Sequence, residues 1–198
     1  MNSFFRTSSS TRFGLNGPRL AALFFLFLLF GSLAVQGQTN WTGGTSTDWN
    51  TAGNWASGTI PTATDDVVIP SASVNQPILS TTATAKSVEV QSGASLSITA
   101  AGSLTINGSK NVGGFTAAFA NRGSTRNAGG LVLGNTANVG AAAIFNQGSF
   151  ANVGGTIRMD RTSNQAINNN QGTFTNTGTI IAGEAVSVGS HGIFNLAT

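Results

Sequence analysis

Few side chains in this 198-residue chain could carry out chemistry, and they are widely spaced. The chain has no cysteine and a single histidine, His191, which excludes a thiol nucleophile and a zinc site built from several histidines. No Gly-x-Ser-x-Gly turn is present to expose a nucleophilic serine. The sequence therefore favours a protein that is not an enzyme, with no catalytic residue, no metal and no cofactor.

One enzymatic alternative remains, a polysaccharide-cleaving protein. Glycoside cleavage uses two carboxyl groups at a defined separation. Asp160 and Glu184 lie about one repeat apart and could stack on adjacent repeats. Four arginines are the basic candidates, although the simpler interpretation is that they are exposed to solvent at the corners of the coils. They are Arg122, Arg126, Arg158 and Arg161.

The elements that must position these residues belong to an internal repeat. An Asn-x-Gly motif recurs at Asn121, Asn146 and Asn170, and a further copy starts at Asn195. A fixed period of about 24–25 residues is typical of a solenoid, in which each repeat is one coil stacked on the next. A leucine-rich repeat is the alternative, but leucine is scarce here, and Gly, Asn and Thr are poor helix formers.

Within each repeat, every second residue follows the order apolar, Asn, Gly. This period of two predicts strands with these positions on one face. We expect Phe150 and Phe174 to point inward and stack on adjacent coils, while Ser149 and Thr173 face water. We also expect stacked asparagines to form interior hydrogen-bonded ladders at the corners. The predicted ladder residues are Asn121, Asn127, Asn146, Asn152, Asn170 and Asn176.

The predicted fold is therefore all-β, a parallel β-helix (β-solenoid) with about 24–25 residues per coil. The repeats are expected to span residues 86–198, with the last one incomplete. Residues 86–108 would form the first coil, because three short alternating segments lie there between small-residue turns. Residues 109–117, with Gly113 and Gly114, would be a looser joint.

Residues 1–37 read as a secretory signal peptide. Three arginines precede the apolar run 20–30, and small residues follow it. We expect cleavage after Gly37, with Ala34 as the second choice. A membrane anchor is the weaker alternative, because the run is shorter than the ~20 residues of a spanning helix. No membrane insertion is expected after cleavage.

Removal of this segment changes the charge of the protein. The chain has nine Lys and Arg against six Asp and Glu, a net charge of +3. Three arginines leave with the signal, so six basic residues then balance six acidic ones. The mature protein has no basic excess for binding nucleic acid.

Residues 38–85 form a different module that contains all three tryptophans, Trp41, Trp49 and Trp55. The open end of a solenoid exposes strand edges and an apolar interior, so we expect these side chains to act as a lid. The alternative is an aromatic platform for stacking sugars. The neighbouring Asp65 and Asp66 would end a turn before a strand, or alternatively contribute to a calcium site.

The tryptophans, the Asn54-Trp55 pair, Pro61 and the Asp-Asp-Val segment at 65–67 together form a recognisable pattern. Over about residues 39–108, this pattern resembles the opening module of large secreted surface proteins of Gram-negative bacteria. These are type IX-secreted or autotransporter-like repeat proteins, in which such a module precedes β-solenoid repeats. The resemblance implies a secreted or outer-surface location, with surface glycans or other surface proteins as partners. It transfers no shared biochemical activity.

The function that we expect is that of an exported structural or adhesin-like β-solenoid segment without catalytic activity. The alternative is a carbohydrate-binding or polysaccharide-cleaving β-helix protein. Ile193 and Phe194 align with the start of the preceding repeats, and we expect the uncovered last coil to allow end-to-end self-association.

Overall fold

The computed structural model of the chain describes residues 37–183 and 191–196. Apart from Gly37, the predicted signal peptide lies outside the described residues. Glu184 also lies outside them, and of His191 only the backbone is described.

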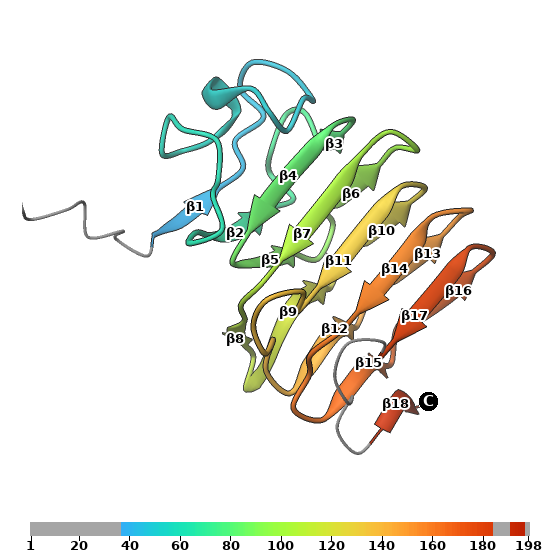
Figure 1. Cartoon of the computed structure of the whole chain (residues 1–198). Coiled ribbons are helices and arrows are strands. Elements are labelled where there is room, and N and C mark those ends of the chain that lie inside the picture. Colours follow the sequence, from blue (N-terminus) through green and yellow to red (C-terminus); the bar gives the residue numbers. More distant parts are fainter. Residues whose placement is uncertain (1–36, 184–190, 197–198) are drawn as a thin grey trace, which may run out of the picture. The chain divides into compact units, whose positions relative to one another are not determined.

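The described residues form a stack of β-coils whose strands lie in three sheets, and successive coils pair in parallel (Figure 1). Each coil contributes one strand to each sheet in turn, which confirms the predicted parallel β-solenoid. The first sheet runs in the order β1 (Gln38–Asn40), β2 (Asp66–Ile69), β5 (Ser87–Val90), β9 (Phe115–Asn121), β12 (Ala142–Asn146), β15 (Gln165–Asn170) and β18 (His191–Leu196).

The other two sheets have five strands each. The second sheet runs β3 (Ile78–Leu79), β6 (Ser95–Ile98), β10 (Ser124–Asn127), β13 (Ser149–Asn152) and β16 (Thr173–Asn176). The third sheet runs β4 (Thr82–Ala85), β7 (Ser103–Ile106), β11 (Gly130–Leu133), β14 (Thr156–Met159) and β17 (Thr179–Ala182).

Alternating side chains explain why these segments are strands. In β7, for example, Leu104 and Ile106 are buried, while Ser103 and Thr105 between them are partly exposed. Parallel, in-register pairing then places like residues above one another, and the core is a set of apolar columns along the solenoid axis. Phe150 and Phe174 confirm the prediction for their column, with ring centroids 5.1 Å apart and planes 15° from parallel.

Glycines occupy the corners because the backbones of consecutive coils approach each other there. A Cβ atom built on Gly148 would overlap the carbonyl oxygen of Gly123, one coil earlier. Gly178 meets the carbonyl oxygen of Gly155 in the same way at the next corner. Only glycine fits these contacts without moving the backbone.

The solenoid begins earlier than the sequence indicated. Strands β2, β3 and β4 pair with β5, β6 and β7, so residues 66–85 form a coil before the one expected first, at 86–108. The repeat signal was weak in this coil because β3 has only two residues. The expected loose joint is also more ordered than predicted. There, β8 (Lys110–Val112) pairs antiparallel with the start of β9 through a turn at Gly113 and Gly114, both with positive φ.

Candidate functional site

The tryptophan cluster lies inside the fold. Trp41, Trp49 and Trp55 are 1%, 0% and 3% exposed. Trp55 makes edge-to-face contacts with both others, at centroid distances of 5.0 Å to Trp41 and 4.7 Å to Trp49. A platform for stacking sugars needs an exposed ring face, so the proposed carbohydrate-stacking role of these three residues is wrong.

Two of the three indole nitrogens are hydrogen-bonded, while Nε1 of Trp49 is buried without a partner among the described residues. Trp55 Nε1 donates to the carbonyl oxygen of Trp49 at 2.8 Å, and Trp41 Nε1 donates to that of Asn75 at 2.6 Å. Hydrogen-bonding the polar end of a buried indole removes most of the cost of burying it. The arrangement rigidifies the segment that precedes β2.

Asn54, the last residue of η1 (Ala52–Asn54), is a second anchor that the sequence did not reveal. Its side chain is fully buried. Oδ1 accepts hydrogen bonds from the backbone of Thr45 (2.9 Å) and Ser46 (2.8 Å), while Nδ2 donates to the carbonyl oxygen of Asp48 (2.8 Å). One amide thus closes the loop between Trp41 and Trp49. The Asn54-Trp55 pair in the sequence could have pointed to this anchor, but only the tryptophan was given a role.

This Trp-rich segment covers the end of the second sheet. The backbone nitrogen of Ile78 in β3 donates to Thr47 at 2.7 Å, and that of Trp49 donates to Ile78 at 3.1 Å. The edge of β3 that faces away from β6 is therefore paired. Beside the cluster, on the outside, lies an open pocket of about 310 Å³, lined by Asn40, Trp41, Thr42, Ala56, Pro70, Ala72 and Ser73.

Asparagines form two hydrogen-bonded columns in the interior. At the first corner, Nδ2 of Asn121 donates to Oδ1 of Asn146 at 2.7 Å, Asn146 to Asn169 at 2.7 Å, and Asn169 to Asn195 at 2.8 Å. At the second corner, Asn127 donates to Asn152 at 2.8 Å and Asn152 to Asn176 at 2.6 Å. Each amide reaches the next coil in the same direction.

The predicted ladder position of Asn170 is wrong. Asn169 lies opposite Asn146, and Asn170 pairs with Leu196 instead. The corner that follows is one residue longer than in the preceding coil, and Gln171 there has a positive φ of 67°. The shared Asn-Gln-Gly motif therefore misled the alignment, because the extra residue enters between the ladder asparagine and the corner glycine.

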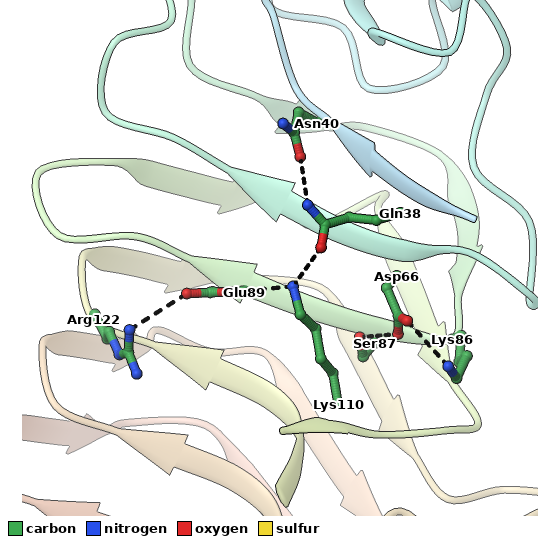
Figure 2. A network of polar contacts seen from close by, with 8 residues as sticks. All are labelled: Gln38, Asn40, Asp66, Lys86, Ser87, Glu89, Lys110 and Arg122. Atoms are coloured by element: carbon green, nitrogen blue, oxygen red, sulfur yellow. Dashed lines mark hydrogen bonds and ion pairs between the residues drawn. The ribbon is translucent and has the colours of Figure 1, made fainter. Parts of the chain in front are cut away.

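A network of polar side chains lies near the N-terminal end of the first sheet and joins residues far apart in the sequence (Figure 2). Glu89, in β5, lies between two cations, 3.4 Å from Nζ of Lys110 and 3.5 Å from Nη1 of Arg122. Its side chain is only 9% exposed. Nζ of Lys110 also donates to Oε1 of Gln38 at 2.9 Å, which ties β8 to β1. The network links β1, β5, β8 and β9.

A second ion pair lies near this network (Figure 2). Asp66 in β2 accepts from Nζ of Lys86 at 3.0 Å and from Oγ of Ser87 at 2.5 Å. The preceding carboxylate, Asp65, accepts from both the backbone and the hydroxyl of Thr62. These contacts agree with the turn-ending role.

Of the candidate catalytic pair, the structure describes only Asp160. Asp160 is fully buried, and its carboxylate accepts from Nε of Arg158 at 2.8 and 3.1 Å. Glu184 lies outside the described residues, so the stacking of Asp160 on Glu184 stays a prediction. Across residues 37–183 and 191–196, no group of three His, Cys, Asp or Glu side chains could hold a metal ion.

The four arginines are distributed over different elements. Arg122 contacts Glu89, Arg158 pairs with Asp160, and Arg161 donates to the carbonyl oxygen of Asn135. Arg126 is exposed on β10. Arg122, Arg158 and Arg161 are thus engaged in contacts within the fold.

The comparisons with known proteins identify a family for this fold. The model of a domain of unknown function, DUF8693, matches residues 40–170, which include the tryptophan cluster and four complete coils. No curated protein and no solved structure matches the chain. Because the matched residues make up more than half of the sequence, the chain belongs to the DUF8693 family.

Proposed function

We propose that this chain is an exported structural segment of the bacterial cell surface, an adhesin-like spacer without catalytic activity. One observation carries the proposal, namely the use of the polar and aromatic side chains within the fold itself. The asparagines bond to each other along the interior, the tryptophans are buried, and Glu89, Asp66 and Asp160 are engaged in ion pairs. No convergent set of reactive groups is left among the described residues.

The architecture suits a spacer. Each coil adds about 4.8 Å of length along the axis through backbone hydrogen bonds. One column of outward positions in the second sheet carries small side chains that follow one another in register, namely Ser95, Ser124, Ser149 and Thr173. A stack of this kind grows by repetition without a larger core, because each coil contacts only its neighbours.

The proposed export rests on the basic and apolar segment before Gly37. In the described part of the chain, no helix has the length and apolar character needed to cross a membrane. Expression of the tagged full chain in a Gram-negative host, followed by N-terminal sequencing of the surface-labelled protein, tests the proposal. We expect Gln38 as the first residue. Recovery only of cytoplasmic protein that retains residues 1–37 would contradict export.

The position of the cleavage site has a structural consequence. The backbone nitrogen of Asp66 donates to the carbonyl oxygen of Gly37 at 2.8 Å. Cleavage after Gly37 removes this acceptor, whereas cleavage after Ala34 retains it. Sequencing therefore also decides whether the first hydrogen bond of β1 with β2 survives in the mature protein.

A carbohydrate-binding protein is the second candidate function. The open pocket beside the cluster favours it, because polar side chains of Asn40, Thr42 and Ser73 line it. A glycan array probed with the mature chain separates the two candidates. The spacer proposal predicts no saturable binding, and binding that is lost in Asn40→Ala would favour the second candidate.

The absence of hydrolysis is a separate test. We expect the mature chain to cleave no polysaccharide, since Asp160, the described member of the candidate pair, is fully buried and paired with Arg158. Cleavage that Glu184→Gln abolishes would replace the spacer proposal with the enzymatic alternative.

A further inference from the structure

Gln38, Asn40 and Glu89 lie on one outward face of the first sheet. In β1, Thr39 is buried, while Gln38 and Asn40 on either side of it are exposed. Asn40 pairs with Val68 and Val68 with Glu89, so Asn40 and Glu89 belong to the same column of side chains. The lysine of β8 reaches this face from 72 residues further along the chain than Gln38. An amide, a carboxylate and an amine therefore meet on the outside of the sheet.

Lys110 contacts both the amide and the carboxylate. Its Nζ donates to Oε1 of Gln38 at 2.9 Å and lies 3.4 Å from Oε2 of Glu89 (Figure 2). The other oxygen of Glu89, Oε1, lies 3.5 Å from Nη1 of Arg122, so the two cations contact different oxygens. On the amide, Nε2 of Gln38 donates to Oδ1 of Asn40 at 3.3 Å. These contacts fix the orientation of the amide and direct Oε2 of Glu89 to the lysine.

A lysine amine, a carboxamide and a carboxylate are the groups from which an isopeptide bond can form. The amine becomes a nucleophile when it loses a proton, and a carboxylate beside it can accept that proton. Cδ of Gln38, the carbon to be attacked, is bonded to the oxygen that the amine already contacts. The fold thus holds the two reacting side chains together, which makes their reaction effectively unimolecular.

We propose that Lys110 and Gln38 join in an isopeptide bond, with Glu89 as the group that transfers the proton. Oε2 of Glu89 accepts a proton from Nζ, and the neutral amine attacks Cδ of Gln38. The bond from Cδ to Nε2 then breaks, Glu89 gives the proton to the departing nitrogen, and one ammonia leaves. The three groups react with each other within the fold, so the reaction takes no outside substrate. Its product ties β1 covalently to β8.

Mass spectrometry of a tryptic digest of the purified full chain tests this bond. Trypsin does not cleave after a lysine whose side chain is acylated. The peptide that ends at Lys86 should therefore stay joined to residues 87–122, with one ammonia lost, and fragment ions should place the link between Gln38 and Lys110. The first peptide ends at Lys86 wherever the signal peptide is cleaved, so the result does not depend on the proposed cleavage site.

Three variants assign the roles of the side chains. Lys110→Arg keeps the positive charge without the amine, and Glu89→Gln keeps the shape of the side chain without the base, so both should lose the linked peptide. Lys86→Arg is the matched control, because Lys86 pairs with Asp66 and should not affect the link. Circular dichroism checks that each variant is folded. A link that persists in folded Glu89→Gln would overturn the role of the carboxylate.

Cyclisation of Gln38 is the competing reaction. If Gln38 is the first residue of the mature chain, its own α-amino group can attack Cδ and release the same ammonia. The cyclised product leaves residues 38–86 unlinked, and trypsin then cleaves after Lys110. Recovery of this product, or of the two peptides without loss of ammonia, would overturn the proposed bond.

Discussion

The side-chain nitrogen of Asn127 donates to Oδ1 of Asn152 at 2.8 Å, whereas Oδ1 of Asn127 itself is buried and has no hydrogen-bond partner among the described residues. The residue opposite Asn127 on the preceding coil is Ile98. The other column starts differently, because Oγ1 of Thr125 donates to Oδ1 of Asn121 at 2.9 Å. One column is thus capped by a hydroxyl, and the other begins on an unsatisfied acceptor.

Extending the second column should be tolerated better than placing an amide elsewhere in the core. In Ile98→Asn, the new side chain lies opposite Asn127 and can donate to its Oδ1. In Leu96→Asn, on the same strand, the amide lies opposite Thr125, whose hydroxyl already donates to Asn121. Both changes lose apolar burial, and we expect Ile98→Asn to be the less destabilising by about 1–2 kcal/mol. Urea unfolding of both variants decides this, and a larger loss for Ile98→Asn would contradict it.

Replacing Asn152 in the middle of the Asn127 column should lower the free energy of unfolding more than replacing the adjacent Ala151. Asn152 accepts from Asn127 and donates to Asn176, so Asn152→Leu leaves hydrogen-bonding groups on both sides unpaired. We expect a loss of about 1–3 kcal/mol in the free energy of unfolding. Ala151→Leu, an outward position in the same strand, should change it by no more than about 0.5 kcal/mol. Equal effects in chemical denaturation would show that the amide column is not a source of stability.

The repeat made the coil geometry predictable, because period-two alternation and recurring Asn and Gly are local features of the sequence. The same local reading failed at Asn170, where an extra corner residue shifts the pairing to Asn169. Local sequence also could not decide whether the tryptophans form a lid or a platform for sugars. Their burial depends on contacts with distant residues such as Asn75. The contact of Lys110 with Gln38 spans 72 residues, and no local pattern could have indicated it.

Gln171 holds the strained position of that longer corner. It is the single non-glycine residue with a positive φ in the described chain. Gln171→Gly removes the steric cost of about 1–2 kcal/mol of this conformation but adds unfolded-state entropy of about 0.5–1 kcal/mol. We therefore expect a net stabilisation of up to about 1 kcal/mol by thermal unfolding. Thr175→Gly, in the adjoining strand, has only the entropic cost and should destabilise.

Glu89 should control the exposure of the hairpin formed by β8 and β9. Glu89→Ala removes the carboxylate that lies between Lys110 and Arg122, which leaves β8 tied to the stack by fewer side-chain contacts. We expect faster trypsin cleavage after Lys110 and Arg122, mapped by mass spectrometry. Arg126 on β10 is the internal control, because it has no part in this network. A uniform rise at all three sites would indicate global destabilisation instead of local release.

The hairpin at residues 110–117 shows how the stack tolerates unequal coils. Val88 and Phe119 are neighbours in the first sheet even though the whole hairpin lies between them in the sequence, and the next pair, Phe119 and Ile144, keeps the same alignment. Pairing between strands of the same sheet fixes the alignment, so the connecting segments can differ in length. The turn at Gly114 faces open space. Foreign peptide sequences inserted there would be displayed on the side of the rod, which makes this turn a graft site for epitopes or tags.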